Sequence, residues 1–422
     1  MAVTAALVAG ATLAGCSSDS GGPPVLFWYI NPDGGGSDPE GGGQAQLAQE
    51  CSTDEYSIDV QLLPNSASDQ RIQLLRRLAA GDTTMDLMSV DPVFVAEFAE
   101  AEYLAPVPED MTDEFTKDRV ESALEAAKWK DKLVAVPFWA NTQLLWYRTS
   151  VADEAGLDMD KPVTWKQLVD AAEKTDTTIG VQSMLYEGYT VWINALVAGA
   201  GGKILENPGA DFNSIEFGLE SPAGEDAAEV ISEVASSGVG GPSMGSSDET
   251  ASLNLFQSDA GGFMVNWPYV YAALEAAEVD WLDDLEAVQY PRTVEGEDSA
   301  PPFGGINLAV GADSANPDLA YEAAACITSV EHQTAYMVGT GNPASSRSVF
   351  DDPEVEKAFP NGIAALIRDS LEKAVPRPQS QYYGDISTGL QMSFSPPSAV
   401  GPQTPANAQT FILDVLKGKA LL

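Results

Sequence analysis

One pentapeptide matches the pattern of a hydrolytic nucleophile. Residues 241–245 read G-P-S-M-G, which fits G-x-S-x-G with Ser243 at its centre. Hydrolases hold such a serine on a sharp turn between a strand and a helix, with a histidine base nearby. Here the serine follows a proline in a loop rich in Gly and Ser, and the chain has one histidine, His332. We interpret the match as coincidental and expect no catalytic residue.

Metal chemistry is also poorly supported. One histidine and three cysteines give few ligands for a transition-metal site, so we expect no metal and no cofactor. The 63 acidic residues leave one enzymatic alternative open. A glycosidase needs two carboxylates that face each other across a cleft, and these need not share a local motif.

A large flat aromatic residue, Trp267, stands where a buried strand is expected to end. A short amphipathic helix begins near Glu249 and carries Leu253 and Phe256 on one face. A glycine-containing turn and the apolar run 263–265 follow, and Pro268 comes directly after the tryptophan. Ligands of open α/β sheets bind at the carboxyl ends of strands. Trp267 is therefore predicted to face a ligand, and the alternative is an aromatic of the core or its rim.

Strands and helices are expected to alternate through the chain. Helical spacing and buried-strand runs predict strands at 25–29, 56–63, 85–90, 142–148 and 305–310, and helices at 44–51, 70–80, 94–102, 165–172, 185–200, 221–236, 318–330 and 404–416. Alternation of this kind gives an α/β fold. A chain of 422 residues is too long for one ordinary core, so two domains are expected.

The charge excludes some partners. With 21 basic and 63 acidic residues, the formal net charge is −42. Such a surface repels phosphate backbones and anionic lipid, so we expect no binding of nucleic acid and no direct adsorption to a membrane.

The first 16 residues form a separate unit. Residues 2–15 carry no charge, and 14 such residues are too few to span a bilayer but fit the core of a signal peptide. The stretch ends in L-A-G-C, which resembles the lipobox of bacterial lipoproteins. The resemblance implies a signal peptide at 1–16, a lipid on Cys16, a tether at 17–24, and anchoring to the outer face of the cytoplasmic membrane.

Export to an oxidising compartment affects the expected redox state of the two remaining cysteines. Cys51 and Cys326 form an even pair in an oxidising compartment, which favours a disulfide between them. The alternative is two buried free thiols.

Four segments, taken in order, resemble the family 1 extracellular solute-binding proteins, the sugar receptors of ABC importers. Maltose- and trehalose-binding proteins are known types, and the trehalose-binding lipoproteins of actinobacteria look most similar. The segments are the strand ending at Asn31, residues 69–71 with 79–82 and the strand to Asp91, residues 136–141 with 145–148, and residues 249–268 with 302–305.

The resemblance implies a two-lobe periplasmic-binding-protein fold of the α/β class, with a hinge and a central ligand cleft. Lobe one would comprise residues 25–138 and 306–348, and lobe two residues 139–305 and 349–422. Both cysteines of the expected disulfide then fall in lobe one, so the two expectations support each other.

The resemblance also implies a sugar site. A pyranose offers an apolar face, which suits an aromatic ring, and a rim of hydroxyls, which suits planar polar groups. Trp267 fits the first role, with Tyr186, Trp139 or Tyr383 as helpers. The expected ligand-binding residues are Asn31, Gln70, Asp91, Asn141, Tyr186, Glu249, Trp267, Gly305 and Arg377.

Several of these residues have a structural alternative. Asp91 could cap the following helix, Asn31 could serve a turn, and Asn141 could satisfy the hinge backbone. Glu249 could be an ordinary acid of a first helical turn, and Arg377 could pair with one of the many acids.

The expected function follows from the resemblance. It is a non-enzymatic, monomeric, lipid-anchored receptor that captures a disaccharide by hinge closure and delivers it to the permease subunits of an ABC importer. Trehalose is favoured, and a receptor for maltose, maltooligosaccharides or another α-glucoside is the alternative. A secreted glycosidase and a surface adhesion module are the alternatives from other classes.

Overall fold

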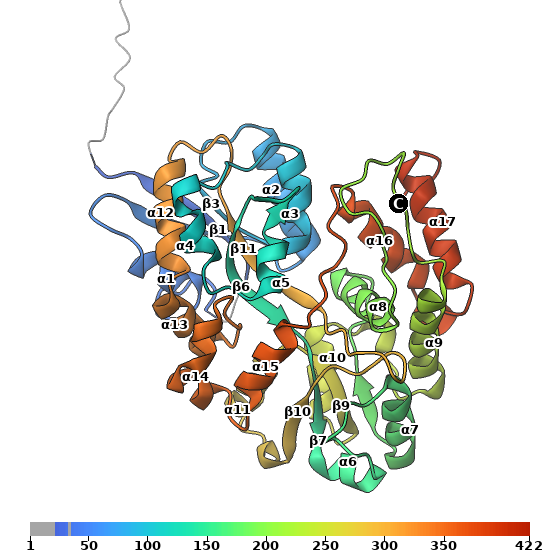
Figure 1. Ribbon diagram of the computed structural model, residues 1–422. Coiled ribbons are helices and arrows are strands. Elements are labelled where there is room, and N and C mark those ends of the chain that lie inside the picture. The colour runs from blue at the N-terminus through green and yellow to red at the C-terminus, as the bar shows by residue number, and fades with distance from the viewer. Residues whose placement is uncertain (1–21, 33–34) are drawn as a thin grey trace, which may run out of the picture.

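Two β-sheets organise the molecule, and each is the centre of one lobe (Figure 1). The computed structural model describes residues 22–32 and 35–422. The expected signal peptide, the acylated Cys16 and most of the tether lie outside the described residues.

The first lobe is built on a five-stranded sheet in the order β2-β1-β3-β11-β6. Strands β1 (Val25–Ile30), β2 (Ser57–Leu62) and β3 (Leu87–Val90) are parallel, whereas β11 (Phe303–Ala309) runs antiparallel to both β3 and β6 (Val136–Thr142). All four side chains of β3 are buried, and three of them are apolar, as is expected for a strand covered on both faces. Helices that belong to this lobe are α1 (Gln44–Glu50), α2 (Ala67–Ala79), α3 (Pro92–Glu100), α12 (Pro317–Ile327) and α13 (Val330–Thr340).

The second lobe is built on a four-stranded sheet in the order β10-β7-β9-β8. Its strands are β10 (Leu285–Val288), β7 (Leu144–Arg148), β9 (Gly261–Asn266) and β8 (Thr178–Gly180). Its main core joins this sheet to α7 (Trp165–Thr175), α8 (Glu187–Gly199), α9 (Pro222–Ser237), α16 (Tyr383–Phe394) and α17 (Thr404–Leu416). The predicted start of α7 is confirmed by a capping box in which Thr164 and Gln167 exchange hydrogen bonds.

The remaining elements connect and extend the lobes. They are α4 (Thr112–Thr116), α5 (Glu121–Ala126), β4 (Lys128–Trp129), β5 (Lys132–Leu133), α6 (Thr149–Ala155), α10 (Glu249–Gln257), α11 (Tyr269–Ala276), α14 (Pro353–Ala358) and α15 (Ile363–Leu371).

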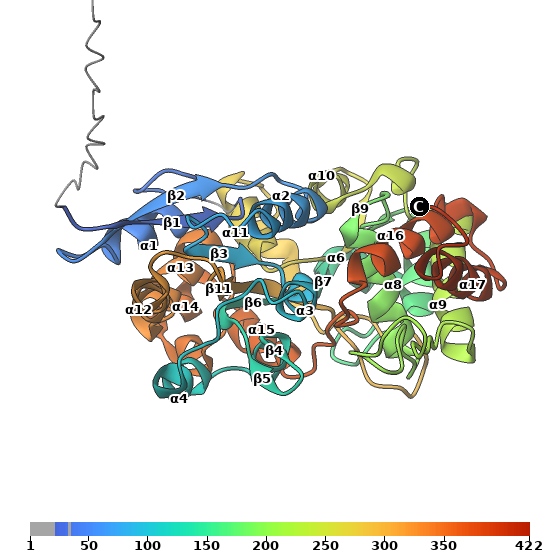
Figure 2. The ribbon, with the colours of Figure 1, turned by 90° about the horizontal axis from the view of Figure 1, so that it is seen from above.

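The chain passes from the first sheet to the second between two strands. We expected one strand over 142–148, but β6 ends at Thr142 and β7 begins at Leu144, so Gln143 alone separates them. Figure 2 shows these strands near the middle of the molecule, between the two sets of helices. The exact segment boundaries given above for the lobes stay a prediction.

The two-lobe α/β fold is confirmed, and so is the disulfide between Cys51 and Cys326. The bridge joins the end of α1 to α12 and links positions 275 residues apart. Within the described ranges, no helix has the length and apolar character needed to cross a bilayer.

Candidate functional site

A cavity of about 350 Å³ lies between the two lobes, and it is lined by all nine residues expected to bind ligand. Its volume falls within the range of about 300–1,000 Å³ that is usual for small-molecule sites. The lining residues are Asn31, Asn65, Ser66, Ala67, Gln70, Asp91, Trp139, Asn141, Tyr186, Glu187, Gly188, Val191, Glu249, Trp267, Tyr269, Gly304, Gly305, Ile306, Asn342 and Arg377.

The first lobe contributes polar side chains from strand ends. Asn31 follows β1 and Asp91 follows β3, two parallel neighbours whose carboxyl ends meet at one edge of the sheet. Gln70 comes from the first turn of α2, and its amide donates to the carbonyl of Pro64 at 2.8 Å. Of the adjacent residues 70 and 71, only Gln70 lines the cavity.

Trp267 leaves the end of β9 and reaches toward the first lobe. Its ring lies against Gly304 of β11, where a Cβ atom would come within 3.2 Å of Trp267 Cη2. Trp267 is half-buried, and its backbone N–H donates a hydrogen bond to Asn266 Oδ1 at 2.8 Å. The lack of a side chain at residue 304 therefore makes room for the tryptophan between the lobes.

Glu249 is the first residue of α10 and lies beside Trp267. Tyr186 donates its hydroxyl to Glu249 Oε2 at 2.7 Å. Burial raises the pKa of this carboxyl, although the Tyr186 hydrogen bond acts in the opposite direction. Glu249 is thus a largely buried acid with aromatic neighbours, able to accept or, when protonated, donate a hydrogen bond.

Arg377 forms a buried network that joins the lobes. Its Nη2 lies 2.9 Å from Asp91 Oδ1 in the first lobe, and its Nη1 lies 2.5 Å from Glu187 Oε1 in the second. Glu187 also accepts hydrogen bonds from Tyr383 and Ser387. Burial lowers the pKa of Arg377, but the surrounding acids outweigh this and leave the pKa well above its ordinary value. The guanidinium stays charged and is fixed in position.

Three acids in the cavity wall share a local setting. Asp91 caps α3 and accepts from the Val93 N–H at 3.2 Å, whereas Glu187 and Glu249 are the first residues of α8 and α10. Helix N-termini stabilise negative charge. This explains how a confined site holds three carboxylates with one arginine.

Asn141 and Gly305 come from the paired strands β6 and β11. Gly304 pairs with Asn141, and Gly305 pairs with Ala140. Gly305 has φ +119°, and a Cβ there would lie 2.2 Å from the carbonyl oxygen of Trp139. Only glycine fits this position, where β11 approaches the neighbouring backbone closely.

Some lining residues escaped the sequence analysis. Glu187, Tyr269 and Asn342 line the cavity but were not expected there. An acid at the start of a helix as apolar as α8 was the available signal for Glu187, since buried acids are rarely unpaired. Among the aromatic helpers considered, Trp139 and Tyr186 line the cavity, whereas Tyr383 is fully buried behind Glu187.

The residues considered for catalysis and metal binding lie elsewhere. Ser243 is in the second lobe, beside a core residue of that lobe, whereas His332 is on α13 of the first lobe, next to the disulfide. His332, Cys51 and Cys326 form a compact group of ligand types, but the two sulfurs are bonded to each other.

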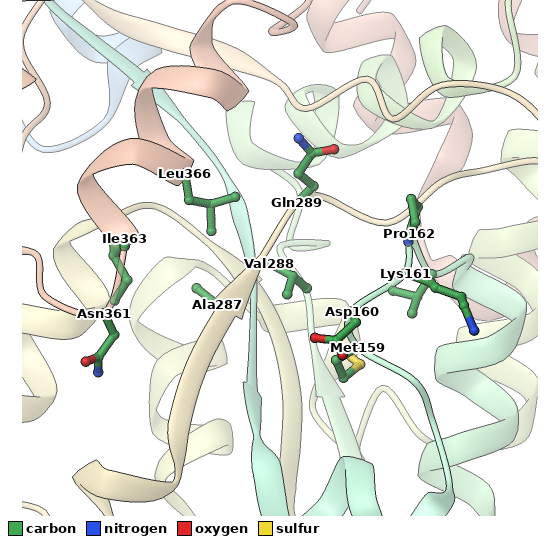
Figure 3. A pocket seen from close by; sticks show the side chains of 12 residues that line it. Met159, Asp160, Lys161, Pro162, Ala287, Val288, Gln289, Asn361, Ile363 and Leu366 are labelled. Carbon is green, nitrogen blue, oxygen red and sulfur yellow. The ribbon is translucent and has the colours of Figure 1, made fainter.

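A second hollow of about 320 Å³ lies between β10, the N-terminal end of α15 and residues 159–163 (Figure 3). Figure 3 shows aliphatic side chains such as Val288, Ile363 and Leu366 together with Lys161 and Gln289. None of the nine expected residues lines it, and no aromatic ring faces it. The cavity between the lobes is the better candidate for ligand binding.

Comparison with known proteins agrees with this geometry. The model of the family described as bacterial extracellular solute-binding protein matches residues 45–334. A probable ABC transporter-binding protein of Deinococcus radiodurans is 24% identical over 358 residues, which cover 79% of this chain and 81% of the relative. A maltotriose-binding protein of Pyrococcus abyssi is 23% identical over 384 residues, covering 89% and 77% respectively.

Among solved structures, maltose-bound MalE3 of T. maritima has the same fold. It superposes with a TM-score of 0.79 at 20% sequence identity, over 94% of this chain and 100% of that chain.

Proposed function

The chain belongs to the family of bacterial extracellular solute-binding proteins, and from that premise we propose that it is a receptor for a disaccharide. Closure of the two lobes would capture the sugar, and the closed receptor would deliver it to the transmembrane subunits of an ABC importer. The family consists of binding proteins rather than enzymes, so the ligand is returned unchanged. The observation that carries the proposal is the meeting of nine expected residues around one cavity.

The chemistry of the walls suits a sugar. Trp267, Tyr186, Trp139 and Tyr269 supply flat apolar surface, against which the C–H face of a pyranose can pack. Amide and carboxylate groups stand around them and can bond the hydroxyl rim. A site built to bond hydroxyls discriminates strongly against analogues that lack them, because its own polar groups would be left unpaired.

The expected affinity is moderate. A disaccharide has about 23 heavy atoms, and at roughly −0.3 kcal/mol per atom the binding free energy reaches about −7 kcal/mol. This corresponds to a Kd of micromolar order, which suits capture followed by release.

Trehalose is the favoured ligand. The lipobox, the cysteine pair and the Trp-Pro and Arg-Pro segments support it, since these resemble the trehalose-binding lipoproteins. Relatives named for maltose and maltotriose support the alternative, a receptor for maltose, maltooligosaccharides or another α-glucoside.

Location and assembly complete the proposal. Cys16 would carry the lipid that holds a monomeric receptor at the outer face of the cytoplasmic membrane, and residues 17–24 would be its tether. Mass spectrometry of the membrane-bound protein, before and after Cys16→Ala, tests the anchor. A soluble, unlipidated wild-type protein would contradict it.

Thermal denaturation with a sugar panel tests the function. We expect trehalose to raise the Tm of the wild type and to leave that of Trp267→Ala unchanged. The absence of a shift with trehalose, maltose, maltotriose and sucrose would reject the sugar receptor. Recovery of each disaccharide intact after incubation separates a receptor from a glycosidase.

A further inference from the structure

The lobes also touch each other outside the cavity, where α3 and α2 of the first lobe meet the N-terminal end of α16. In Figure 1 these helices lie on the facing sides of the two lobes. The residues involved are Arg71, Phe94 and Glu97 in the first lobe and Tyr383, Gly384 and Asp385 in the second, and none of them lines the cavity. We call them the α3–α16 contact.

Tyr383 connects the two cores. Its side chain is fully buried and belongs to the same apolar cluster as Phe94 and Phe98 of α3. The rings of Phe94 and Tyr383 meet edge to face, with centroids 5.9 Å apart. Later residues of the same helix, Ile386 and Leu390, pack instead into the core of the second lobe. Separation of the lobes would therefore expose the Phe94–Tyr383 pair to water.

A fixed cation completes the contact. Glu97 holds Arg71 by two hydrogen bonds, of 2.5 Å to Nε and 2.6 Å to Nη2. The flat guanidinium lies against Gly384, where a Cβ would come within 2.8 Å of Arg71 Cζ. The hydrogen bonds that Arg71 donates to Glu97 raise the pKa of Arg71, and the charge of Asp385, across the interface, raises it further.

We propose that the α3–α16 contact is a closure latch, whose residues raise the affinity for sugar without touching it. The inference rests on the proposed function. A favourable contact that forms only when the lobes are together lowers the free energy of that state alone. Because the apparent Kd equals the intrinsic Kd divided by the fraction of binding-competent protein, a latch that raises this fraction lowers the Kd. Tyr383 links the latch to the cavity, since its hydroxyl donates to Glu187.

Gly384→Leu is the most discriminating variant. The Cβ of leucine at this helical position would lie 2.8 Å from Arg71 Cζ, so the guanidinium must leave its place against α16 and strain its pairing with Glu97 when the lobes close. The substitution therefore opposes closure. It also raises helix propensity by up to about 1 kcal/mol, so a weakened fold is not expected. Gly401→Ala is the control, because a Cβ at residue 401 meets nothing within 4 Å.

Calorimetry with trehalose and small-angle scattering of the ligand-free protein give separate readouts. For Gly384→Leu we expect a Kd about tenfold higher than that of the wild type, equivalent to about 1.4 kcal/mol. We also expect a larger radius of gyration and no loss of Tm, while Gly401→Ala matches the wild type. Phe94→Leu, which removes the ring contact, is expected to act in the same direction.

A Kd within twofold of the wild type and an unchanged radius of gyration, in both Gly384→Leu and Phe94→Leu, would overturn the latch. If the wild type binds no sugar, the proposed function fails and scattering alone decides on the latch. An unchanged radius of gyration in that case also overturns it.

Discussion

Most polar residues around the cavity have a structural role as well as a place in the wall. Asp91 caps α3 and pairs with Arg377, and Asn31 accepts a hydrogen bond from Gln44 at 2.9 Å. Asn141 Oδ1 accepts a hydrogen bond of 3.0 Å from the backbone N–H of Thr142, the last residue of β6. Each of these residues therefore makes structural contacts and also lines the cavity. Such contacts fix the rotamers that a binding site needs.

At this scale, Glu249 gives a pH-dependent prediction. Burial raises the pKa of its carboxyl above the ordinary value of 4.5, so the folded protein binds this proton more strongly than the unfolded chain. The stability that the proton contributes is present below about pH 4.5 and is lost as the pH rises through the raised pKa. Glu249→Gln retains a neutral side chain at every pH. We expect its Tm to match the wild type near pH 4.5 and to exceed it increasingly toward neutral pH.

Thermal melts of the ligand-free proteins between about pH 4 and 8 measure this difference. Glu297→Gln, on an exposed loop, is the control and should show no such trend. A Tm difference for Glu249→Gln that stays constant over this range would contradict the prediction.

At the scale of elements, long apolar segments were predictable, and so was the final helix, α17, which was expected at residues 404–416. The helices α14, α15 and α16 before it were not predicted. The strands β1, β3 and β9 are buried along most of their length, so their residues are apolar and their sequence signal is strong. The helix α16 contains two glycines and several Ser and Thr, which have low helix propensity. Its packing against both lobes decides its structure. For α15, the spacing of Ile363, Ile367 and Leu371 was an available signal that was missed.

The close approach of β11 to β6 gives a prediction at Gly305. Alanine there would have to adopt φ +119° and would clash with the Trp139 carbonyl. We expect Gly305→Ala to lower the free energy of unfolding by about 1–3 kcal/mol, as measured by urea denaturation. Gly245→Ala, where a Cβ has its nearest neighbour at 3.7 Å, is the control. Equal stability of the two variants would show that the backbone relaxes without cost.

The disulfide gives a second prediction for elements. It ties α1 to α12 within the first lobe and closes a long loop of the unfolded chain. The double variant Cys51→Ser/Cys326→Ser is expected to lose about 2–5 kcal/mol of stability. Chemical denaturation measures the loss, and a stability equal to that of the wild type would contradict it.

At the scale of the whole molecule, two properties were readable from the sequence before the structure. The order of segments implied two lobes, and the acidic composition implied a strongly charged surface. The contacts between the lobes could not be predicted from the sequence, because those of Arg377 and Tyr383 join residues far apart in the chain. Glu187 illustrates the limit: its role depends on partners that only the fold brings together.

The net charge of −42 gives a prediction for the whole molecule. Self-repulsion destabilises a compact protein, and salt screens it. We expect the Tm of the ligand-free protein to rise between about 0.05 M and 1 M NaCl. A Tm that falls over this range would indicate that favourable surface ion pairs such as Lys166–Asp170, which salt also screens, dominate instead.

The most direct test of the account is a calorimetric titration of the purified protein with trehalose, with Trp267→Ala alongside. We predict one binding site per chain and a Kd of micromolar order for the wild type. The variant should give no measurable heat of binding. Equal binding by both proteins would contradict the role of the cavity, and no binding by the wild type to trehalose or to any maltose-type sugar would contradict the receptor itself.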